Sequence, residues 1–438
     1  MRTAKTFIIE DIATFKKRLL YWSHQNTHVS FLDTNAHRMD TSSFEAICAV
    51  GAEEVLAVSE ANALQLLRDF KKKTQDWLFG YISYDVKNEI EDLSSQNCDR
   101  LGFNQLSFFR PKKIILIREA KVEFLYLNAY KDSIDADFEA IGRQTFLSLS
   151  SSGDPTPPPP KIKLRVTRDA YLNTLEKVLE KIYRGDIYEV NICQEFYAEG
   201  TTIDVLKTFW HLNQISEAPF SCFLKEHDHY VLCASPERYL KREGTRVISQ
   251  PIKGTAARSG NPEVDAHLKG ELAKDLKERS ENIMIVDLVR NDLSRVAKVG
   301  SVDVDELCAV YSFKQVHQMI STVSAEVDKG MDSIDIIKAS FPMGSMTGAP
   351  KVAAMEIIEE MEQTKRGVYS GAVGYFTPTD DFDFNVVIRT ILYNSDSNYV
   401  SFTVGSAITA KAIPSQEYAE CLLKAKAMRE ALESSGDA

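Results

Sequence analysis

Four consecutive prolines at 157–160 divide the sequence and limit which segments can share a strand or a helix. They end the Ser-rich stretch LSLSSSGDPTPPPPK, residues 147–161. Proline fixes φ and donates no backbone hydrogen bond, so such a run favours extended polyproline II over a place inside a sheet. We therefore expect an exposed connector here, between an N-terminal lobe at 1–146 and a catalytic domain at 162–438.

The segments after the prolines alternate between helical and strand patterns. An apolar stripe at helical spacing predicts a helix between Thr167, the expected N-cap, and Gly185, the expected stop. We expect further helices at 271–297, 351–366 and 415–434, and strands at 187–200, 369–378, 384–394 and 399–409. Strands interleaved in this way with helices predict an α+β fold with large, mainly antiparallel sheets.

Composition excludes several classes of protein. The 438 residues are 44% hydrophobic and carry a net charge of −11, which permits a large core but offers no basic surface for nucleic acid or an anionic membrane. The seven cysteines are scattered without a C-x-x-C pair, and the sequence has no signal peptide and no run of 18 apolar residues. We therefore expect a reduced, cytoplasmic protein that neither binds nucleic acid nor crosses a membrane.

Acidic residues recur on one face of two expected helices. Glu281 and Asp292 share a face of the first, and Glu417, Glu420 and Lys424 share a face of the second. Surface electrostatics explains such spacing, since a Glu–Lys pair at i, i+4 adds about 0.2–0.5 kcal/mol to a helix. Alternatively, the carboxylates converge on a hard cation such as Mg²⁺, which accepts one or two carboxylates with waters and an anionic ligand. The spacing leaves both interpretations open.

Four other polar residues each have a structural and a functional explanation. Arg389 lies in an expected apolar strand, where it either pairs within the fold or binds a carboxylate. Glu237 ends a strand, where an acid serves a turn or faces a cleft. His317 lies in a half-buried strand, where a satisfied histidine is more common than a ligand contact. Lys253 lies in an apparent loop, SQPIKGTAARSG, and is either a structural cation or an amine held against a substrate.

Together the motifs resemble the chorismate-utilising enzymes, which include anthranilate synthase component I, aminodeoxychorismate synthase component I, isochorismate synthases and salicylate synthases. The matching segments, in chain order, are SPERYL, QPIKGTAAR, RSENIMIVDLVRNDLSRV, FPMGSMTGAPKVAAMEIIEEME, YSGAVGYF, NVVIRT and VGSAITAKAIPSQEYAECLLKA. The resemblance runs from about residue 161 to the C-terminus and is looser before it, where WLFGYISYD is similar to the family's N-terminal region. It implies antiparallel sheets packed as a sandwich with helices on the outside.

The resemblance also implies a site that binds chorismate, a dicarboxylate, against Mg²⁺. Glu281 and Glu420 match the family's metal ligands, with Glu417 close by. The residues that match substrate contacts are His317, Thr347, Tyr369, Arg389, Gly405, Ser406, Ala407 and Lys424. Glu237 matches the acid that helps to expel the C4 hydroxyl group, which requires an apolar setting that raises its pKa.

Lys253 separates two members of the family. This chain has PIKGT, and so do the aminodeoxychorismate synthases that it resembles. Anthranilate synthases have PIAGT at the same place. In the aminodeoxychorismate synthases the lysine is a nucleophile that attacks C2 of chorismate, after which ammonia adds at C4 to give 4-amino-4-deoxychorismate, a precursor of p-aminobenzoate and folate. The amine must lose its proton near pH 7, against a reference pKa of about 10.4, and we expect burial beside the metal and Arg389 to lower that pKa.

Two alternatives stay open: anthranilate synthase component I, and a catalytically idle chorismate-binding or scaffold protein for an amidotransferase. Glu189 stands where the family often has glutamine and where isochorismate synthases have a lysine base. Glu189 therefore argues against isochorismate chemistry. Three interpretations of this carboxylate stay open: it orders ammonia, it orders Lys253, or it has no role in the reaction.

The sequence also predicts one partner and one further ligand site. It has no G-x-C-x-G nucleophile elbow, so we expect a separate glutamine amidotransferase subunit to supply ammonia. The family's tryptophan pocket is partly matched, by Thr34, Thr41, Ser42, Ser43, Phe44, Pro219, Phe220 and Ser221.

Overall fold

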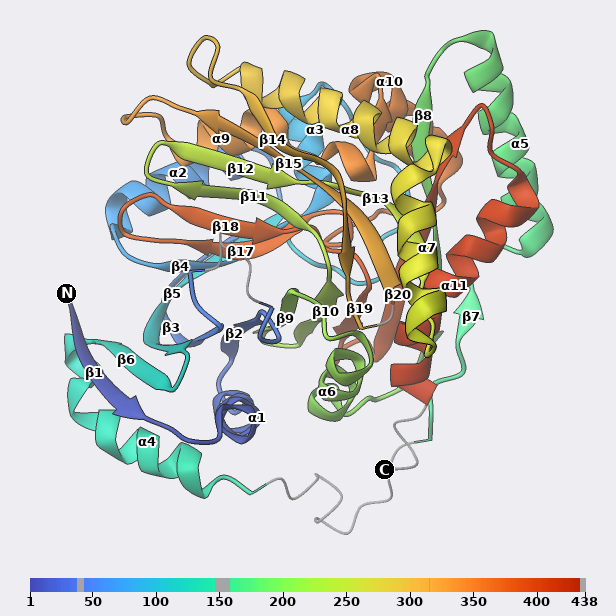
Figure 1. The fold of residues 1–438 in the computed structure, drawn as a ribbon. Coiled ribbons are helices and arrows are strands. Elements are labelled where there is room, and N and C mark those ends of the chain that lie inside the picture. Colours follow the sequence, from blue (N-terminus) through green and yellow to red (C-terminus); the bar gives the residue numbers. More distant parts are fainter. Residues whose placement is uncertain (38–42, 146–157, 315, 434–438) are drawn as a thin grey trace.

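The computed structural model describes residues 1–37, 43–145, 158–314 and 316–433. Every strand ladder in these ranges is antiparallel, and the strands connect through β5 (Leu106–Arg118) into two arms that face each other (Figure 1). The expected α+β fold with large antiparallel sheets is confirmed.

The first arm begins at β1, passes through β5 and ends at the strand that carries Glu189, with each strand paired to the next. In spatial order it contains β1 (Arg2–Ile8), β6 (Lys121–Leu127), β5, β3 (Ala46–Val58), β2 (His28–Asp33), β9 (Phe220–Glu226), β10 (His229–Ser235), β19 (Thr390–Asn394), β20 (Tyr399–Thr409) and β8 (Glu189–Glu199), with β7 (Lys163–Leu164) and β16 (Gly348–Ala349) on the far edge of β8.

The second arm leaves the other edge of β5 and ends at the strand that carries Lys253. Its spatial order is β4 (Leu78–Ile82), β17 (Ala372–Phe376), β18 (Phe382–Asn385), β11 (Arg238–Glu243), β12 (Arg246–Gln250) and β15 (Val316–Glu326), which also pairs with β13 (Ile252–Ala257) and β14 (Asp303–Ser312).

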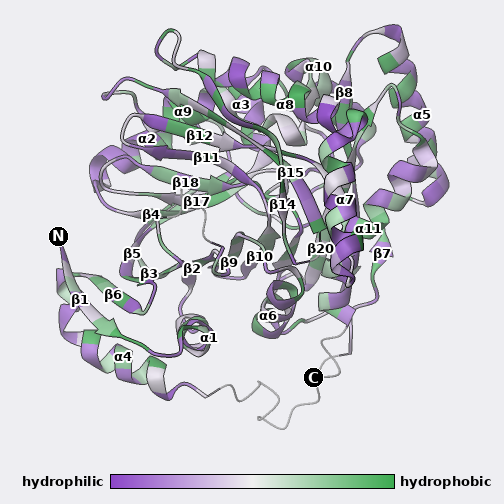
Figure 2. Cartoon of the chain, in the orientation of Figure 1, coloured by the Kyte–Doolittle hydropathy of each residue, from purple (hydrophilic) through white to green (hydrophobic). Residues whose placement is uncertain are grey.

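Helices lie outside the two arms (Figure 1). They are α1 (Ile12–Ser23), α2 (Ala63–Thr74), α3 (Lys87–Ile90), α4 (Ile134–Arg143), α5 (Arg168–Arg184), α6 (Val205–Ser216), α7 (Pro262–Lys274), α8 (Leu276–Ser294), α9 (Ser333–Ser340), α10 (Lys351–Met361) and α11 (Pro414–Glu433). Hydrophilic and hydrophobic residues alternate along them, as amphipathic outer helices require (Figure 2).

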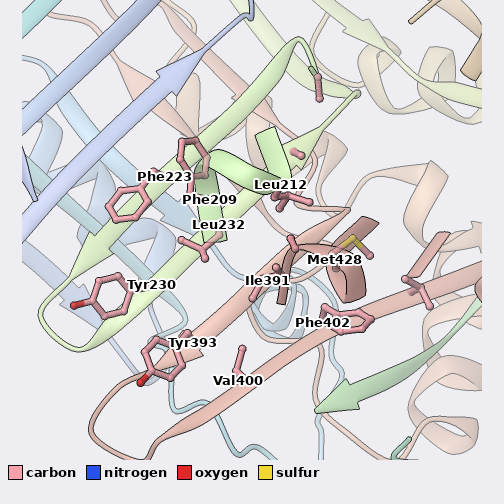
Figure 3. Close-up of a cluster of buried hydrophobic side chains, with 14 of the residues drawn as sticks. Phe209, Leu212, Phe223, Tyr230, Leu232, Ile391, Tyr393, Val400, Phe402 and Met428 are labelled. Carbon is pink, nitrogen blue, oxygen red and sulfur yellow. The ribbon is translucent and has the colours of Figure 1, made fainter. Parts of the chain in front are cut away.

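Apolar packing holds the layers together. One buried cluster joins the two arms, with Leu224 and Val231 from the first and Leu240, Val323 and Phe384 from the second. A second cluster packs α6 and α11 against the first arm; it contains Phe209, Leu212, Phe223, Tyr230, Leu232, Ile391, Tyr393, Val400, Phe402 and Met428 (Figure 3). Burial of such side chains stabilises a fold by about 1.5–3 kcal/mol each.

Several expected elements are confirmed and others change at their ends. The Thr167 hydroxyl accepts a hydrogen bond from the Ala170 amide at the start of α5, and Gly185 ends it with φ 90°. The helix expected at 271–297 is two helices, because the Asp275 carboxylate caps a new start at Leu276. The helix expected to reach residue 366 ends at Met361.

The strand expected at 384–394 is interrupted. Strand β18 ends at Asn385 and β19 begins at Thr390. Between them the amides of Val386 and Val387 bond to Glu237 and Gly371, and Arg389 has φ 50°. These bonds replace regular ladder pairing, so Arg389 lies in a short irregular segment rather than within a strand.

The sheet continues across the expected boundary between the N-terminal lobe and the catalytic domain. Strand β2 pairs with β9, and β4 pairs with β17. Most of the expected connector, residues 147–157 of 147–161, lies outside the described residues, and the domain division stays a prediction. No helix in the described ranges combines the length and the apolar character needed to cross a bilayer.

Candidate active site

Lys253 lies in a bulged strand, not in the tight loop that its neighbours indicate. Register between β13 and β15 shifts between Ile252 and Thr255, so Lys253 and Gly254 form the irregular part. Gly254 has φ 98°, and a Cβ there would lie 3.2 Å from Cβ of Met319. A bulge changes the direction of a side chain. This one directs the amine of Lys253 toward Glu189 at the start of β8, and the Lys253 side chain is only 11% exposed.

The amine of Lys253 is surrounded by carboxylates. Its Nζ donates to Oε1 of Glu189 at 2.6 Å. Burial lowers the pKa of Lys253, but the charges of Glu189, Glu281 and Glu420 outweigh it and raise the pKa above its ordinary value. The expectation was that burial beside the metal and Arg389 lowers this pKa; in the protein without a metal ion the shift has the opposite sign, because the acidic groups of the site act on the amine directly.

Glu237 occupies the apolar setting expected for a protonated acid. It sits between β10 and β11, is 4% exposed, and accepts a hydrogen bond from the Ser345 hydroxyl at 2.7 Å. Burial raises its pKa to about 7, even though this hydrogen bond and the charges of Lys253 and Arg389 favour the ionised form. The group can thus hold a proton near neutral pH.

Two interrupted strands bring Arg389 beside Glu237. The carbonyl of Glu237 accepts from the Val386 amide at 3.0 Å, and the carbonyl of Arg389 accepts from the Ala234 amide at 3.2 Å. The breaks in β10–β11 and β18–β19 therefore face each other. Burial lowers the pKa of Arg389, and the charge of Glu237 acts against this shift. A partly buried guanidinium beside an acid that can be neutral is suited to bind an incoming carboxylate.

The three expected metal ligands gather near Lys253 from α8 and α11. Burial raises the pKa of Glu281 to about 7, with the charge of Glu189 adding to the effect. Burial and the charge of Glu420 raise the pKa of Glu417. Asp292, on the same face as Glu281, instead pairs with Lys351 at 2.6 Å and belongs to the scaffold.

The donor set fits Mg²⁺ without forming a complete cage. Across the described residues, no three His, Cys, Asp or Glu side chains are arranged to enclose a metal ion by themselves. Mg²⁺ needs only one or two carboxylates when waters and an anionic ligand complete its shell. Burial is the main cause of the raised pKa values of Glu281 and Glu417, and the negative charges of Glu189 and Glu420 add to it; a divalent cation would relieve this repulsion.

The strand pair β8–β20 carries the expected backbone contacts for substrate. Gly405, Ser406 and Ala407 pair with residues 191–193 of β8. Lys424 Nζ donates to the Gly405 carbonyl at 3.0 Å and pairs with Glu420 at 2.7 Å, so it ties α11 to this strand.

Three other expected substrate contacts are buried and engaged by protein groups. Thr347 is fully buried and its hydroxyl donates to the Met343 carbonyl at 3.2 Å. The Tyr369 hydroxyl lies 3.6 Å from Sγ of Cys193. His317 is 1% exposed, with its ring nitrogens 3.0 Å from Asp265 and 2.9 Å from the Ser312 hydroxyl. The substrate roles of these residues stay predictions.

Sequence patterns gave no sign of the buried ion pair under the site. Arg366 pairs with Glu362 at 2.6 Å and donates to the carbonyls of Met346 and Asn191 at 2.6 and 2.8 Å. Glu362 in turn accepts from the Cys193 amide at 2.9 Å. The pair fixes β8 against the segment that carries Ser345. The i, i+4 spacing of Glu362 and Arg366 is visible in the sequence, but their burial and their bonds to Asn191, Cys193 and Met346 depend on the tertiary fold.

A separate pocket lies away from Lys253, between the two arms. It encloses about 450 Å³, its mouth included, and six of the residues expected for tryptophan line it: Thr34, Ser43, Phe44, Pro219, Phe220 and Ser221. The other two, Thr41 and Ser42, lie outside the described residues. Arg238 also lines the pocket and pairs with Asp383 at 2.9 Å, so charged and aromatic groups meet there.

The geometry supports acid-assisted substitution on an anionic substrate. It joins an amine, a carboxyl group that holds a proton near pH 7, a guanidinium and an oxygen-rich cluster. Sequence comparison finds that residues 17–430 match the family model described as chorismate binding enzyme.

Three known proteins illustrate the similarity. Aminodeoxychorismate synthase component 1 of Bacillus subtilis is 32% identical over 369 residues, covering 82% of this chain and 78% of that protein. Anthranilate synthase component 1 of Cereibacter sphaeroides is 30% identical over 419 residues, covering 91% and 82%. The crystal structure of anthranilate synthase component I from Streptococcus pneumoniae superposes with a TM-score of 0.75 at 25% identity, covering 90% of this chain and 94% of that one.

Proposed function

The chain belongs to the family of chorismate binding enzymes, and on that premise we propose that it is the chorismate-aminating component of an aminodeoxychorismate synthase. In this reaction chorismate and ammonia give 4-amino-4-deoxychorismate and water. Overall similarity leaves anthranilate synthase component 1 as the alternative, because relatives of both names match over most of the chain.

The observation that carries the proposal is the position of Lys253. Its buried amine shares one site with Glu237, whose pKa is raised to about 7, and the charges of the two groups act on each other. An amine and a proton donor that face the same space can act on one substrate from two sides. An anthranilate synthase, with alanine at this position, would lack the nucleophile.

The residues divide the reaction as follows. The lone pair of the Lys253 amine forms a bond to C2, the two conjugated ring double bonds each shift by one position, and the C4–O bond breaks while Glu237 gives its proton to the leaving hydroxyl, which departs as water. Ammonia then forms a bond to C4, both double bonds shift back, and the C2–N bond breaks to release Lys253. Arg389 holds a substrate carboxylate throughout.

Glu281 and Glu420, with Glu417 beside them, are the residues that would hold Mg²⁺. Bound there, the ion would neutralise a carboxylate of the substrate within a site that already contains several carboxylates. Ammonia is proposed to come from a separate glutamine amidotransferase subunit, in keeping with the name component 1 of the Bacillus subtilis relative.

Product analysis tests the function directly. Purified protein with chorismate, ammonium and Mg²⁺ is expected to form 4-amino-4-deoxychorismate, which is not fluorescent and releases no pyruvate. Chromatography with mass detection, together with anthranilate fluorescence, separates the two candidates. Fluorescent anthranilate and free pyruvate as main products would establish the alternative function instead, and no turnover at all would favour an idle binding protein.

Replacing Glu420 with glutamine is expected to raise the Mg²⁺ concentration for half-maximal turnover by at least about tenfold, because one anionic ligand becomes neutral. Titration of turnover with Mg²⁺ measures the effect. Glu433→Gln is the matched control: it lies on the same helix and pairs with Arg429 at 2.9 Å on the surface. An unchanged Mg²⁺ dependence of Glu420→Gln would reject its place in the metal site.

Tryptophan binding in the separate pocket also stays a prediction. The aromatic side chain of Phe44 and the ion pair of Arg238 with Asp383 offer surfaces for an indole ring and for an amino acid's charges. Titration calorimetry with tryptophan is expected to show binding of one molecule per chain, and alanine serves as the control ligand. Equal heats of binding for tryptophan and alanine would show that the pocket is not a tryptophan site.

A further inference from the structure

The carboxylate of Glu189 is hydrogen-bonded to the amine of Lys253, and none of the reaction steps above gives it a role. Its Oε1 accepts from Lys253 Nζ at 2.6 Å, and the residue is 2% exposed. Its second oxygen, Oε2, is buried without a hydrogen-bond partner. A buried carboxylate oxygen normally has a partner, since leaving it unbonded costs about 1–3 kcal/mol or more. Glu189 thus carries an unsatisfied acceptor beside the reacting nitrogen.

The backbone around Glu189 is fixed from both sides. It is the first residue of β8, paired with Thr409 of β20 on one edge and with Ala349 of β16 on the other. The approach of β16 is so close that a Cβ on Gly348 would lie 2.1 Å from the Glu189 carbonyl oxygen. The carboxylate therefore cannot move away from Lys253 by a shift of its strand.

We propose that Glu189 takes the proton from the Lys253 ammonium group as chorismate reacts and returns that proton to the amine when the C2–N bond breaks. This role rests on the proposed function of Lys253 as the nucleophile. The proton passes along the existing 2.6 Å hydrogen bond: the N–H bond breaks, an O–H bond forms on Glu189, and the free lone pair attacks C2. No proton enters or leaves the site, because the ammonium–carboxylate pair becomes an amine–carboxylic acid pair.

In the protein alone the neighbouring carboxylates favour the charged amine, and the exclusion of water by bound chorismate shifts the balance toward transfer. An ion pair is less stable relative to the neutral amine–acid pair when water is excluded and a carboxylate oxygen has no hydrogen-bond partner. Oε2 of Glu189 is such an oxygen. Glutamine at position 189 would accept the same hydrogen bond but could not take the proton. The proton of Lys253 would then have to pass to solvent, although the side chain is only 11% exposed.

The decisive measurement is the pH dependence of adduct formation. Wild type and Glu189→Gln are mixed with chorismate and Mg²⁺ without ammonia, quenched, and analysed by intact-protein mass spectrometry between pH 6 and 9. In wild type the rate should vary little with the ionisation of Lys253, because the proton stays within the pair. In Glu189→Gln the rate relative to wild type at the same pH should be about 100-fold lower at pH 7 and should recover about tenfold for each pH unit as solvent removes the proton; the ratio cancels the pH dependence that Glu237 gives to both proteins.

Two further variants separate proton transfer from structural support. Glu189→Asp keeps the base but shortens its reach, so it should react more slowly than wild type by a factor that is the same at every pH. Glu195→Gln removes another buried carboxylate of β8, which pairs with Arg165 at 3.0 Å and accepts from the Tyr399 hydroxyl at 2.7 Å. It should keep the wild-type rate and pH profile. Circular dichroism and thermal melting establish that each variant is folded.

Each outcome bears on one proposal or the other. Glu189→Gln with a wild-type rate and profile, or with faster adduct formation at every pH, overturns proton acceptance and shows that Glu189 merely keeps Lys253 charged. A wild type that makes 4-amino-4-deoxychorismate without any lysine adduct also overturns it, while the overall reaction stands. A wild type that makes anthranilate overturns the proposed function itself.

Discussion

Lys253→Ala is expected to abolish the chorismate adduct and to slow the formation of 4-amino-4-deoxychorismate by about 10³-fold or more, as loss of a covalent nucleophile does in other enzymes. Alanine removes the amine but keeps the strand, because Gly254 and not residue 253 requires the unusual backbone of the bulge. The substrate site should stay intact, since Arg389 and Glu237 are held by backbone bonds from other strands.

Intact-protein mass spectrometry after rapid quenching measures the adduct, and chromatography measures the product. Lys225→Ala is the matched control. Burial also lowers the pKa of Lys225, whose amine donates to the His24 carbonyl at 2.8 Å, so it is a second partly buried lysine in a strand. This control should form the adduct as wild type does. An adduct that persists in Lys253→Ala would show that another residue is the nucleophile.

Glu237→Gln is expected to lower turnover by about 10²–10⁴-fold, because an amide cannot give a proton to the leaving hydroxyl group. The wild-type carboxyl has a pKa of about 7 and is active when protonated. Its contribution to the rate is therefore present below pH 7 and is lost as the pH rises through 7. The alkaline fall near pH 7 should disappear in Glu237→Gln, and initial rates from pH 5.5 to 9 would reveal it.

The same substitution should increase stability at alkaline pH. Burial raises the folded-state pKa of Glu237 from 4.5 to about 7, so the folded protein binds this proton more tightly than the unfolded chain. Stability from this group is full below pH 4.5 and is lost as the pH rises toward 7. Glutamine avoids that loss, by up to about 3 kcal/mol at pH 8, which urea denaturation at pH 5 and pH 8 measures.

Glu226→Gln is the control that separates catalysis from burial. Glu226 is also buried, in β9, and burial raises its pKa to about 7 as well. Its replacement should give a similar gain in stability at pH 8 with unchanged turnover. If Glu226→Gln and Glu237→Gln lowered turnover equally, the acid role of Glu237 would fail.

The sequence by itself determined the local elements and the chemical inventory. Thr167 and Gly185 fixed the ends of α5 because capping acts over three or four residues. The order of motifs identified Glu237, Lys253, Glu281, Arg389 and Glu420 together. The apolar setting of Glu237 was also expected, because the resemblance assigns this residue the role of a proton donor.

Only the tertiary structure decided how these groups act on one another. The bulge at Gly254 and the break before Arg389 each depend on hydrogen bonds between distant segments. The sign of the pKa shift of Lys253 depends on carboxylates from β8, α8 and α11. Electrostatic effects sum over neighbours in space, whatever their distance along the chain. The pairing of Glu189 with Lys253 is therefore visible only in the folded structure, where β8 and β13 lie close together.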